Sequence, residues 1–147
     1  MKDLDHVSDF LKELRNRTDS KKILVIGGGG NQNGSVSSSL EILECGLLKD
    51  NDFEEIGIAG HPEGSPDIDQ NTVNEFLNKK YELSKDKNLN LELVTQFFFN
   101  AEPFIKWCKF LDNSNIKLPV RVGFPGPASF KTPVSYTHLR AHETQFH

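Results

Sequence analysis

The chain has 147 residues, of which 36% are hydrophobic and 26% charged, and its formal net charge at pH 7 is −4. This composition is typical of a folded globular protein rather than a disordered chain. Acidic and basic residues are interspersed without a basic stripe, so neither nucleic acid nor a membrane surface is an expected partner. No apolar run could span a bilayer and the first residues lack a signal-peptide core, so we expect a cytoplasmic protein.

The two cysteines, Cys45 and Cys108, stand far apart in the sequence and match no metal-binding spacing. We expect free buried thiols in a reducing compartment rather than a disulfide. The length predicts a single domain or a part of a larger one.

Hydrophobic periodicity predicts helices and strands in alternation along the chain. Helices are expected over residues 3–17, 37–48, 69–86 and 101–111, and strands over residues 23–26, 56–59, 89–95 and 119–122. Because residues 23–26 are apolar throughout and glycines follow them, they predict a strand that is buried on both faces.

Each predicted helix is amphipathic, with one apolar stripe that should face the core. The residues expected on these stripes are Val7, Phe10, Leu11 and Leu14, then Leu40, Leu43 and Leu47, then Val73, Phe76, Leu77 and Tyr81, and finally Phe104, Trp107, Cys108 and Leu111. Serines are available as N-caps of the second helix. Asn100 can cap the fourth helix, which carries Pro103 in its first turn, where proline is tolerated.

The alternation of elements predicts an α/β fold with parallel βα repeats. Two closures of the sheet fit this pattern, an open doubly wound sheet and a piece of a (βα)8 barrel. A complete barrel needs about 250 residues, so four strands would form about half of one. In both architectures the functional loops follow the carboxyl ends of the strands. Here these loops are residues 27–34, 60–66, 96–100 and 123–129.

The first of these loops, GGGGNQNG at residues 27–34, is unusually rich in glycine. It lacks the third glycine of a dinucleotide-binding fingerprint, and no acidic residue follows at the ribose position. The run is either a flexible turn or a place where backbone approaches a ligand. We favour backbone contact with a ligand, through Gly28 and Gly29.

The second loop carries His61 and Glu63, which could act as an acid–base pair in a cleft. The alternative is a solvated loop, with Asp67 and Asp69 nearby. Spacing alone favours the solvated loop, while the place of Glu63 at a strand end keeps the acid–base interpretation open.

Gln96 follows a predicted strand and precedes three phenylalanines. An amide at a strand end beside aromatic walls suits a flat heteroaromatic ligand, because the amide reads donor and acceptor edges while the rings provide stacking area. Alternatively, the phenylalanines belong to the core and Gln96 ends the strand. At least one ring should be core, because alternate residues of a strand point to opposite faces.

Three different motifs lie at the ends of neighbouring predicted strands. They are IAGHPEGSPD at residues 58–67, VTQFFF at residues 94–99 and RVGFPGP at residues 121–127. In this order they resemble the methylenetetrahydrofolate reductase family. The second motif is the most specific of the three, and the third is weak alone. The resemblance covers about residues 4–132 and implies a flavin-dependent (βα)8 barrel, of which this chain supplies about half.

Members of this family pass a hydride from NAD(P)H through FAD to methylenetetrahydrofolate, which yields methyltetrahydrofolate for methionine synthesis. The resemblance therefore implies FAD and NAD(P)H as cofactors, a folate substrate and a homo-oligomeric parent protein. It places Gln96 at the glutamine that contacts the pterin and, in turn, the nicotinamide.

The resemblance also implies cofactor-binding positions. Glu63 lies in the loop beside the adenosine side of the flavin, where His61 replaces a family tyrosine. Ser65 replaces a family histidine that contacts FAD. Lys80 resembles a lysine that approaches the FAD phosphates.

Two departures from the family pattern bear on activity. The family carries an arginine and an aspartate where this chain has four glycines at residues 27–30, and that aspartate lies near the flavin ring. The family's proton-donating glutamate belongs to the first barrel strand, which has no counterpart here. We therefore expect this chain by itself to be inactive. Two alternatives remain, a non-redox folate- or flavin-binding paralogue and a doubly wound nucleotide-binding domain.

The last residues form a separate unit of the sequence. After residues 1–132, which we assign to the partial barrel, residues 133–147 depart from the family and read, when back-translated, like a transposase adapter from a sequencing library. His138 and His142 would share one face of a helix as a metal pair. We expect instead a non-native tail whose histidines bind nothing.

Overall fold

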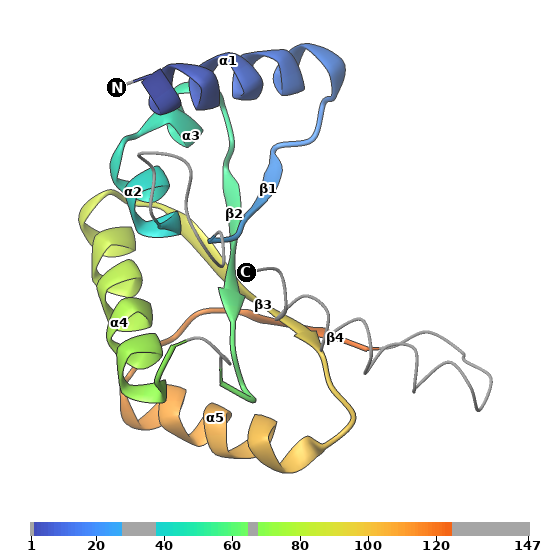
Figure 1. Ribbon diagram of the computed structural model, residues 1–147, viewed down its shortest axis with the longest axis vertical. Coiled ribbons are helices and arrows are strands. Elements are labelled where there is room, and N and C mark those ends of the chain that lie inside the picture. The colour runs from blue at the N-terminus through green and yellow to red at the C-terminus, as the bar shows by residue number, and fades with distance from the viewer. Residues whose placement is uncertain (1, 28–37, 65–67, 125–147) are drawn as a thin grey trace, which may run out of the picture.

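The computed structural model describes residues 2–27, 38–64 and 68–124. In these segments helices and strands alternate, as Figure 1 shows. The helices are α1 (Lys2–Arg17), α2 (Ser39–Glu44), α3 (Leu47–Asp50), α4 (Gln70–Asp86) and α5 (Ala101–Asn113). The strands are β1 (Lys22–Val25), β2 (Glu55–Gly60), β3 (Asn90–Phe97) and β4 (Val120–Gly123).

The four strands form one sheet in the order β1-β2-β3-β4, and every neighbouring pair is parallel. The predicted α/β class with parallel βα repeats is thus confirmed. A doubly wound sheet has a switch point where the strand order reverses. The four described strands contain no such reversal, because each one adds to the same side of the strand before it.

The helices all pack on one face of this sheet. In Figure 1 they follow an arc from α1 through α2 and α4 to α5, and the strands lie on its inner side. One hydrophobic cluster joins them to the sheet, with Leu11 of α1, Leu43 of α2, Leu77 of α4 and Trp107 of α5. Alternate strand residues complete that core, namely Ile23, Val25, Ile56, Ile58, Leu91, Leu93 and Val120. Their register partners match across the sheet, so these side chains share one face.

The other side of the sheet, which we call the open face, is not covered by any described helix. Leu24 lies there, because a Cβ added to its neighbour Gly57 would come within 3.0 Å of the Leu24 side chain. Leu24 is 49% exposed and Ile26, just after β1, is 67% exposed. The prediction that residues 23–26 are buried on both faces is therefore wrong. The apolar run indicated an apolar environment on both sides, but the described helices supply it on only one.

The predicted helix over residues 37–48 is two short helices instead of one. Helix α2 ends at Glu44, and α3 begins at Leu47 after a break at Cys45 and Gly46. Gly46 has a φ of 80°, in the left-handed region that glycine adopts without a Cβ penalty. The break turns the chain so that both Leu43 and Leu48 reach the core.

Four predicted stripe residues lie outside the core cluster: Leu40 and Val73 are half-buried, and Phe10 and Phe76 are exposed. Phe10 is 61% exposed on α1. Phe76 on α4 is 36% exposed, with the Lys79 ammonium 5.4 Å from its ring centroid. Each occupies the margin of its apolar stripe, and the neighbouring Leu11 and Leu77 make the buried contacts instead. Helical periodicity identifies the stripe but not its edge.

The last helix agrees with its prediction. Trp107 and Leu111 are buried, and Phe104 and Cys108 are half-buried against the same cluster. The side chain of Asn100 accepts a hydrogen bond from the Glu102 N–H and caps the helix. Both cysteines are free, but half-buried rather than buried. No helix within the described segments is long and apolar enough to cross a membrane.

Candidate functional site

The carboxyl ends of β2 and β3 bring two of the predicted loops together. Because the strands are parallel and paired from Glu55–Asn90 to Gly60–Thr95, both loops leave the same edge of the sheet. Residues 60–64 and residues 96–98 line one shallow depression there. The structure therefore places Gln96 in one depression with His61 and Glu63.

The loop after β2 is a tight turn. The N–H of Gly64 donates to the carbonyl of His61 at 3.1 Å, and Gly64 has a φ of 79°. At the base of the turn, a Cβ on Gly60 would come within 2.8 Å of the Trp107 ring. Glycine at residue 60 therefore lets the end of β2 pack directly against α5. This contact fixes the position of the backbone from which His61 follows.

The backbone position of Gln96 is fixed by contacts of the neighbouring Thr95 with Gly123. Thr95 is buried and points to the helix side, where its Oγ1 accepts a hydrogen bond from the Gly123 N–H at 3.0 Å. Gly123 packs so closely that an added Cβ would lie 2.8 Å from the Thr95 carbonyl oxygen. Gln96 is exposed and, by the alternation of β3, faces the open side of the sheet. Its amide is thus presented to solvent from a fixed backbone.

The three phenylalanines after Gln96 take different roles. Phe98 is 9% exposed and stacks on Phe104, with ring centroids 5.1 Å apart. Phe97 is half-buried and lines the depression, and its ring meets Phe99 edge-on at 6.0 Å. Phe99 is 56% exposed. The prediction that at least one of these rings belongs to the core is confirmed by Phe98, while Phe97 and Phe98 form the aromatic wall.

His61 lies close enough to Lys80 of α4 for the two charges to interact. Burial, and secondarily the positive charge of Lys80, hold the pKa of His61 below its ordinary value of 6.5. Burial likewise lowers the pKa of Lys80 from 10.5. At neutral pH the imidazole is therefore uncharged, and it can offer one nitrogen as donor and the other as acceptor. Lys80 provides a partly desolvated ammonium beside it.

Of the remaining predicted site residues, only Glu63 lies within the described part of the chain. Glu63 is exposed at the rim of the depression. Asp69, considered above as part of a solvated loop, is the N-cap of α4 and accepts from the N–H groups of Asn71 and Thr72 at 3.0 and 3.1 Å. Gly28, Gly29, Ser65 and the whole of residues 133–147 lie outside the described residues.

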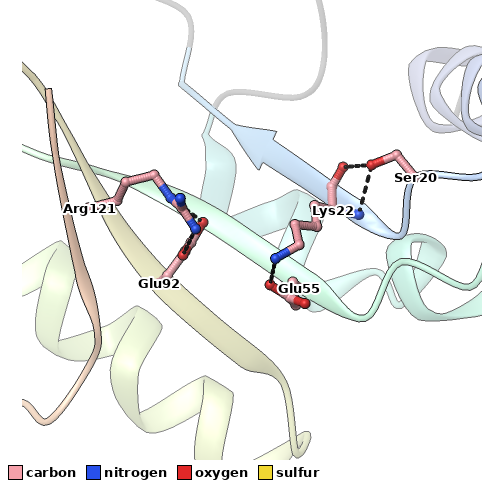
Figure 2. Close-up of polar contacts among 5 residues, drawn as sticks. All are labelled: Ser20, Lys22, Glu55, Glu92 and Arg121. Atoms are coloured by element: carbon pink, nitrogen blue, oxygen red, sulfur yellow. Dashed lines mark hydrogen bonds and ion pairs between the residues drawn. The ribbon is translucent and has the colours of Figure 1, made fainter.

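A polar network on the open face was missed by the sequence analysis. Figure 2 shows Lys22 of β1 paired with Glu55 of β2, and Arg121 of β4 paired with Glu92 of β3. The Arg121 fork is bidentate, with Nε and Nη2 donating to the two Glu92 oxygens at 3.1 and 2.8 Å. This bond and the nearby charge hold the pKa of Glu92 below its usual range. The signal was available in the sequence, because these residues alternate with the core positions of their strands.

A scan against models of protein families found no match to this chain. The described residues contain no group of three or more His, Cys, Asp or Glu side chains that could hold a metal ion. The depression offers an exposed amide, an aromatic wall and an uncharged imidazole, and the Lys80 ammonium acts electrostatically on that imidazole without lining the depression. The depression holds only about 10 Å³, so these groups can contact the edge of a flat polar ring but do not enclose one.

Proposed function

We propose that this chain is part of a flavin-dependent (βα)8 barrel related to the methylenetetrahydrofolate reductases, and that its Gln96 binds the folate substrate. One observation carries the proposal: Gln96 lies in one depression with His61 and Glu63 at the carboxyl ends of β2 and β3. The motifs that carry the family resemblance are thus neighbours in space. Their edge of the sheet is the one that barrel enzymes use for catalysis.

Three features of the fold support a barrel over a doubly wound sheet. The strands are added in sequence order without a reversal. The described helices lie on one face only, as they do on the outside of a barrel (Figure 1). The open face carries Leu24 and Val94, both packed over Gly57. Such side chains would fill the interior layers of a closed barrel.

The described residues fit FAD in their chemistry. Lys80 provides a partly desolvated ammonium for a diphosphate, and His61 and Glu63 provide polar groups for an adenosine. Gln96 would orient the pterin of the folate and, in turn, the nicotinamide, while Phe97 and Phe98 exclude water from one side. When bound, FAD would supply the hydride relay between NAD(P)H and methylenetetrahydrofolate.

We propose further that this chain by itself binds without turning over. Residues 27–30 are four glycines and carry no side chain that could tune the flavin's electronics, so only backbone contact is available there. A homo-oligomeric cytoplasmic parent enzyme, with the complete barrel, would perform the reaction.

Titration of the purified chain with FAD tests the cofactor site. We expect saturable quenching of flavin fluorescence, weakened about tenfold by Lys80→Met, because a hydrogen bond to a charged group contributes about 1.5–3 kcal/mol. Lys79→Met is the matched control, since Lys79 lies over the Phe76 ring instead of near His61. The FAD site is disproved if FAD does not bind, or if both variants weaken binding equally.

Titration with methyltetrahydrofolate tests Gln96. Gln96→Ala should weaken binding by about an order of magnitude, because a ligand polar edge loses its partner. The control Asn78→Ala removes an exposed amide from α4 instead. Equal affinities of the wild type and Gln96→Ala for methyltetrahydrofolate would show that the Gln96 side chain does not contact the ligand.

The alternative function is a non-redox folate- or flavin-binding paralogue, which is favoured by the four glycines at residues 27–30. Turnover separates the two functions. A full-length parent that bleaches its flavin with NAD(P)H and then reduces methylenetetrahydrofolate is the reductase, and one that binds flavin without bleaching is the paralogue. Bleaching of FAD by NADH with residues 1–147 alone would refute the proposed inactivity of this chain.

A further inference from the structure

Another cavity, which we call the amino-end cavity, lies at the amino ends of β2 and β3 on the helix side of the sheet. It has a volume of about 220 Å³ and is open to solvent. Its walls come from the break between α2 and α3, the start of β2 and the connection from α4 to β3. In Figure 1 these parts lie near α3, at the end of the sheet opposite to the loops that follow β2 and β3. The cavity is therefore distinct from the candidate site described above.

The turn at Gly46 leaves room for this cavity. Gly46 has a φ of 80° and separates α2 from α3. A Cβ added to Gly46 would meet no atom within 4 Å, so the space beside the turn is unfilled. The Lys87 ammonium, directly after α4, donates to the carbonyl of Glu44 at 2.6 Å. This bond ties the end of α2 to the opposite wall of the cavity.

The floor of the amino-end cavity is apolar. Leu43, Leu48 and Ile56 are 2%, 3% and 1% exposed, and all three belong to the hydrophobic core. Leu89 adds a half-buried side chain. An apolar cavity of about 150 Å³ already binds benzene, so this larger one has room for a group of about six carbon atoms. Transfer of such a group from water to this floor is favourable.

Charged side chains line the mouth of the cavity. Lys49, Asp50 and Lys87 are exposed there and together carry one net positive charge. An ammonium has three donors, and the bond to Glu44 uses one of those of Lys87. Lys49 forms no ion pair with another described residue. Both ammonium groups therefore have donors from which a carboxylate can accept charge-assisted hydrogen bonds.

We propose that the amino-end cavity binds a small monocarboxylate with an apolar tail of about six carbon atoms. The carboxylate would accept from Lys87 and Lys49, and the tail would lie on the apolar floor. The mouth favours a monoanion over a doubly charged phosphate ester, because Asp50 repels a second negative charge. The site is independent of the proposed function, since it shares no residue with the depression around Gln96.

Titration of the full chain with hexanoate, followed by NMR of the backbone amides, tests the site. We expect saturable shifts at Gly46 and Leu89. Acetate keeps the charge without the tail and should bind at least about tenfold more weakly, since each buried CH₂ contributes about fourfold in affinity. 1-Hexanol keeps the tail without the charge and should bind about fivefold more weakly, which is the upper range for an exposed ion pair.

A charge-removing variant tests the mouth. Lys87→Met should weaken hexanoate binding about threefold to fivefold and leave 1-hexanol binding unchanged, because only the carboxylate loses a partner. Lys85→Met is the matched control, since the Lys85 ammonium pairs with Glu82 at 2.9 Å and lies outside the cavity. Circular dichroism verifies that the variants remain folded. If Lys87→Met unfolds through loss of its bond to α2, Lys49→Met serves as the second variant, with the same expected direction.

Four results would overturn the proposal. Shifts that grow linearly with hexanoate without saturation would show that no site exists. Equal affinities for acetate and hexanoate would indicate an ion contact at the surface, and equal affinities for 1-hexanol and hexanoate would show that the ammonium groups do not bind the carboxylate. A loss with Lys85→Met as large as that with Lys87→Met would place the charge effect outside the cavity. FAD binding is measured separately, so a failure of either proposal is recognised by itself.

Discussion

At the scale of single residues, the charge of His61 depends on its surroundings. Its pKa is lowered first by burial and then by Lys80. The folded chain consequently binds fewer protons at this site than the unfolded chain between the folded pKa and 6.5. Protonation of His61 therefore destabilises the fold as the pH drops through that window, and above about pH 6.5 this penalty is absent.

Lys80→Met should raise the pKa of His61 toward 6.5, because it removes the electrostatic cause and leaves burial, which is the larger one. Titration of the His61 ring by NMR measures the shift directly. Lys79→Met should leave the titration unchanged. A His61 pKa that is identical in wild type and Lys80→Met would show that the two side chains do not interact.

The residue types at the site were predictable, but their surroundings were not. Gln96, His61 and Glu63 stand out in the sequence because each follows a strand. The contribution of Lys80 to the charge state of His61 depends on how α4 packs beside the loop, which periodicity does not specify. The role of Asp69 as a helix cap was likewise decided by local hydrogen bonds.

At the scale of elements, the contact between β3 and β4 positions the site. The register shifts between Val94 and Phe97, where β4 leaves the regular ladder. Gly123 fills this irregularity, with Thr95 Oγ1 accepting its N–H. The backbone that carries Gln96 is therefore fixed by a close approach of two strands.

Gly123→Ala should destabilise the fold by about 1–3 kcal/mol, because overpacking forces rigid groups apart. The added Cβ would meet the backbone of Thr95, Gln96 and Phe97 at 2.8–3.1 Å. Gly27→Ala is the control, since its nearest neighbour would be 4.0 Å away. Urea unfolding compares the two variants. A loss in Gly27→Ala as large as that in Gly123→Ala would contradict a role for close packing.

Most elements could be predicted because their periodicities are strong. The strand and helix order agrees with the sequence pattern, and Asn100 caps α5 as expected. The second helix was predicted too long because Gly46 interrupts an otherwise regular leucine pattern. A glycine within a helical pattern is tolerated or breaks the helix according to its tertiary contacts.

At the scale of the whole molecule, one hydrophobic core joins the described helices to the sheet. Its buried members run from Leu11 to Ile116, with Val120 packed against them. Deletion of residues 133–147 should leave the thermal unfolding midpoint unchanged within about one degree, since we expect these residues to be a non-native tail. Differential scanning calorimetry of both lengths measures this. A fall of several degrees would show that the tail contributes to the fold.

The sequence by itself determined the α/β class, the order of elements and the candidate residues, because alternation and helical spacing are local properties. Tertiary structure decided which sides of the elements are covered. Residues 23–26 are apolar on both sides, yet Leu24 is left on the open face with the ion pairs of Glu55 and Glu92. The physical reason is that the burial of a strand depends on which elements pack against it. The strand's own sequence indicates only that an apolar environment would be favourable.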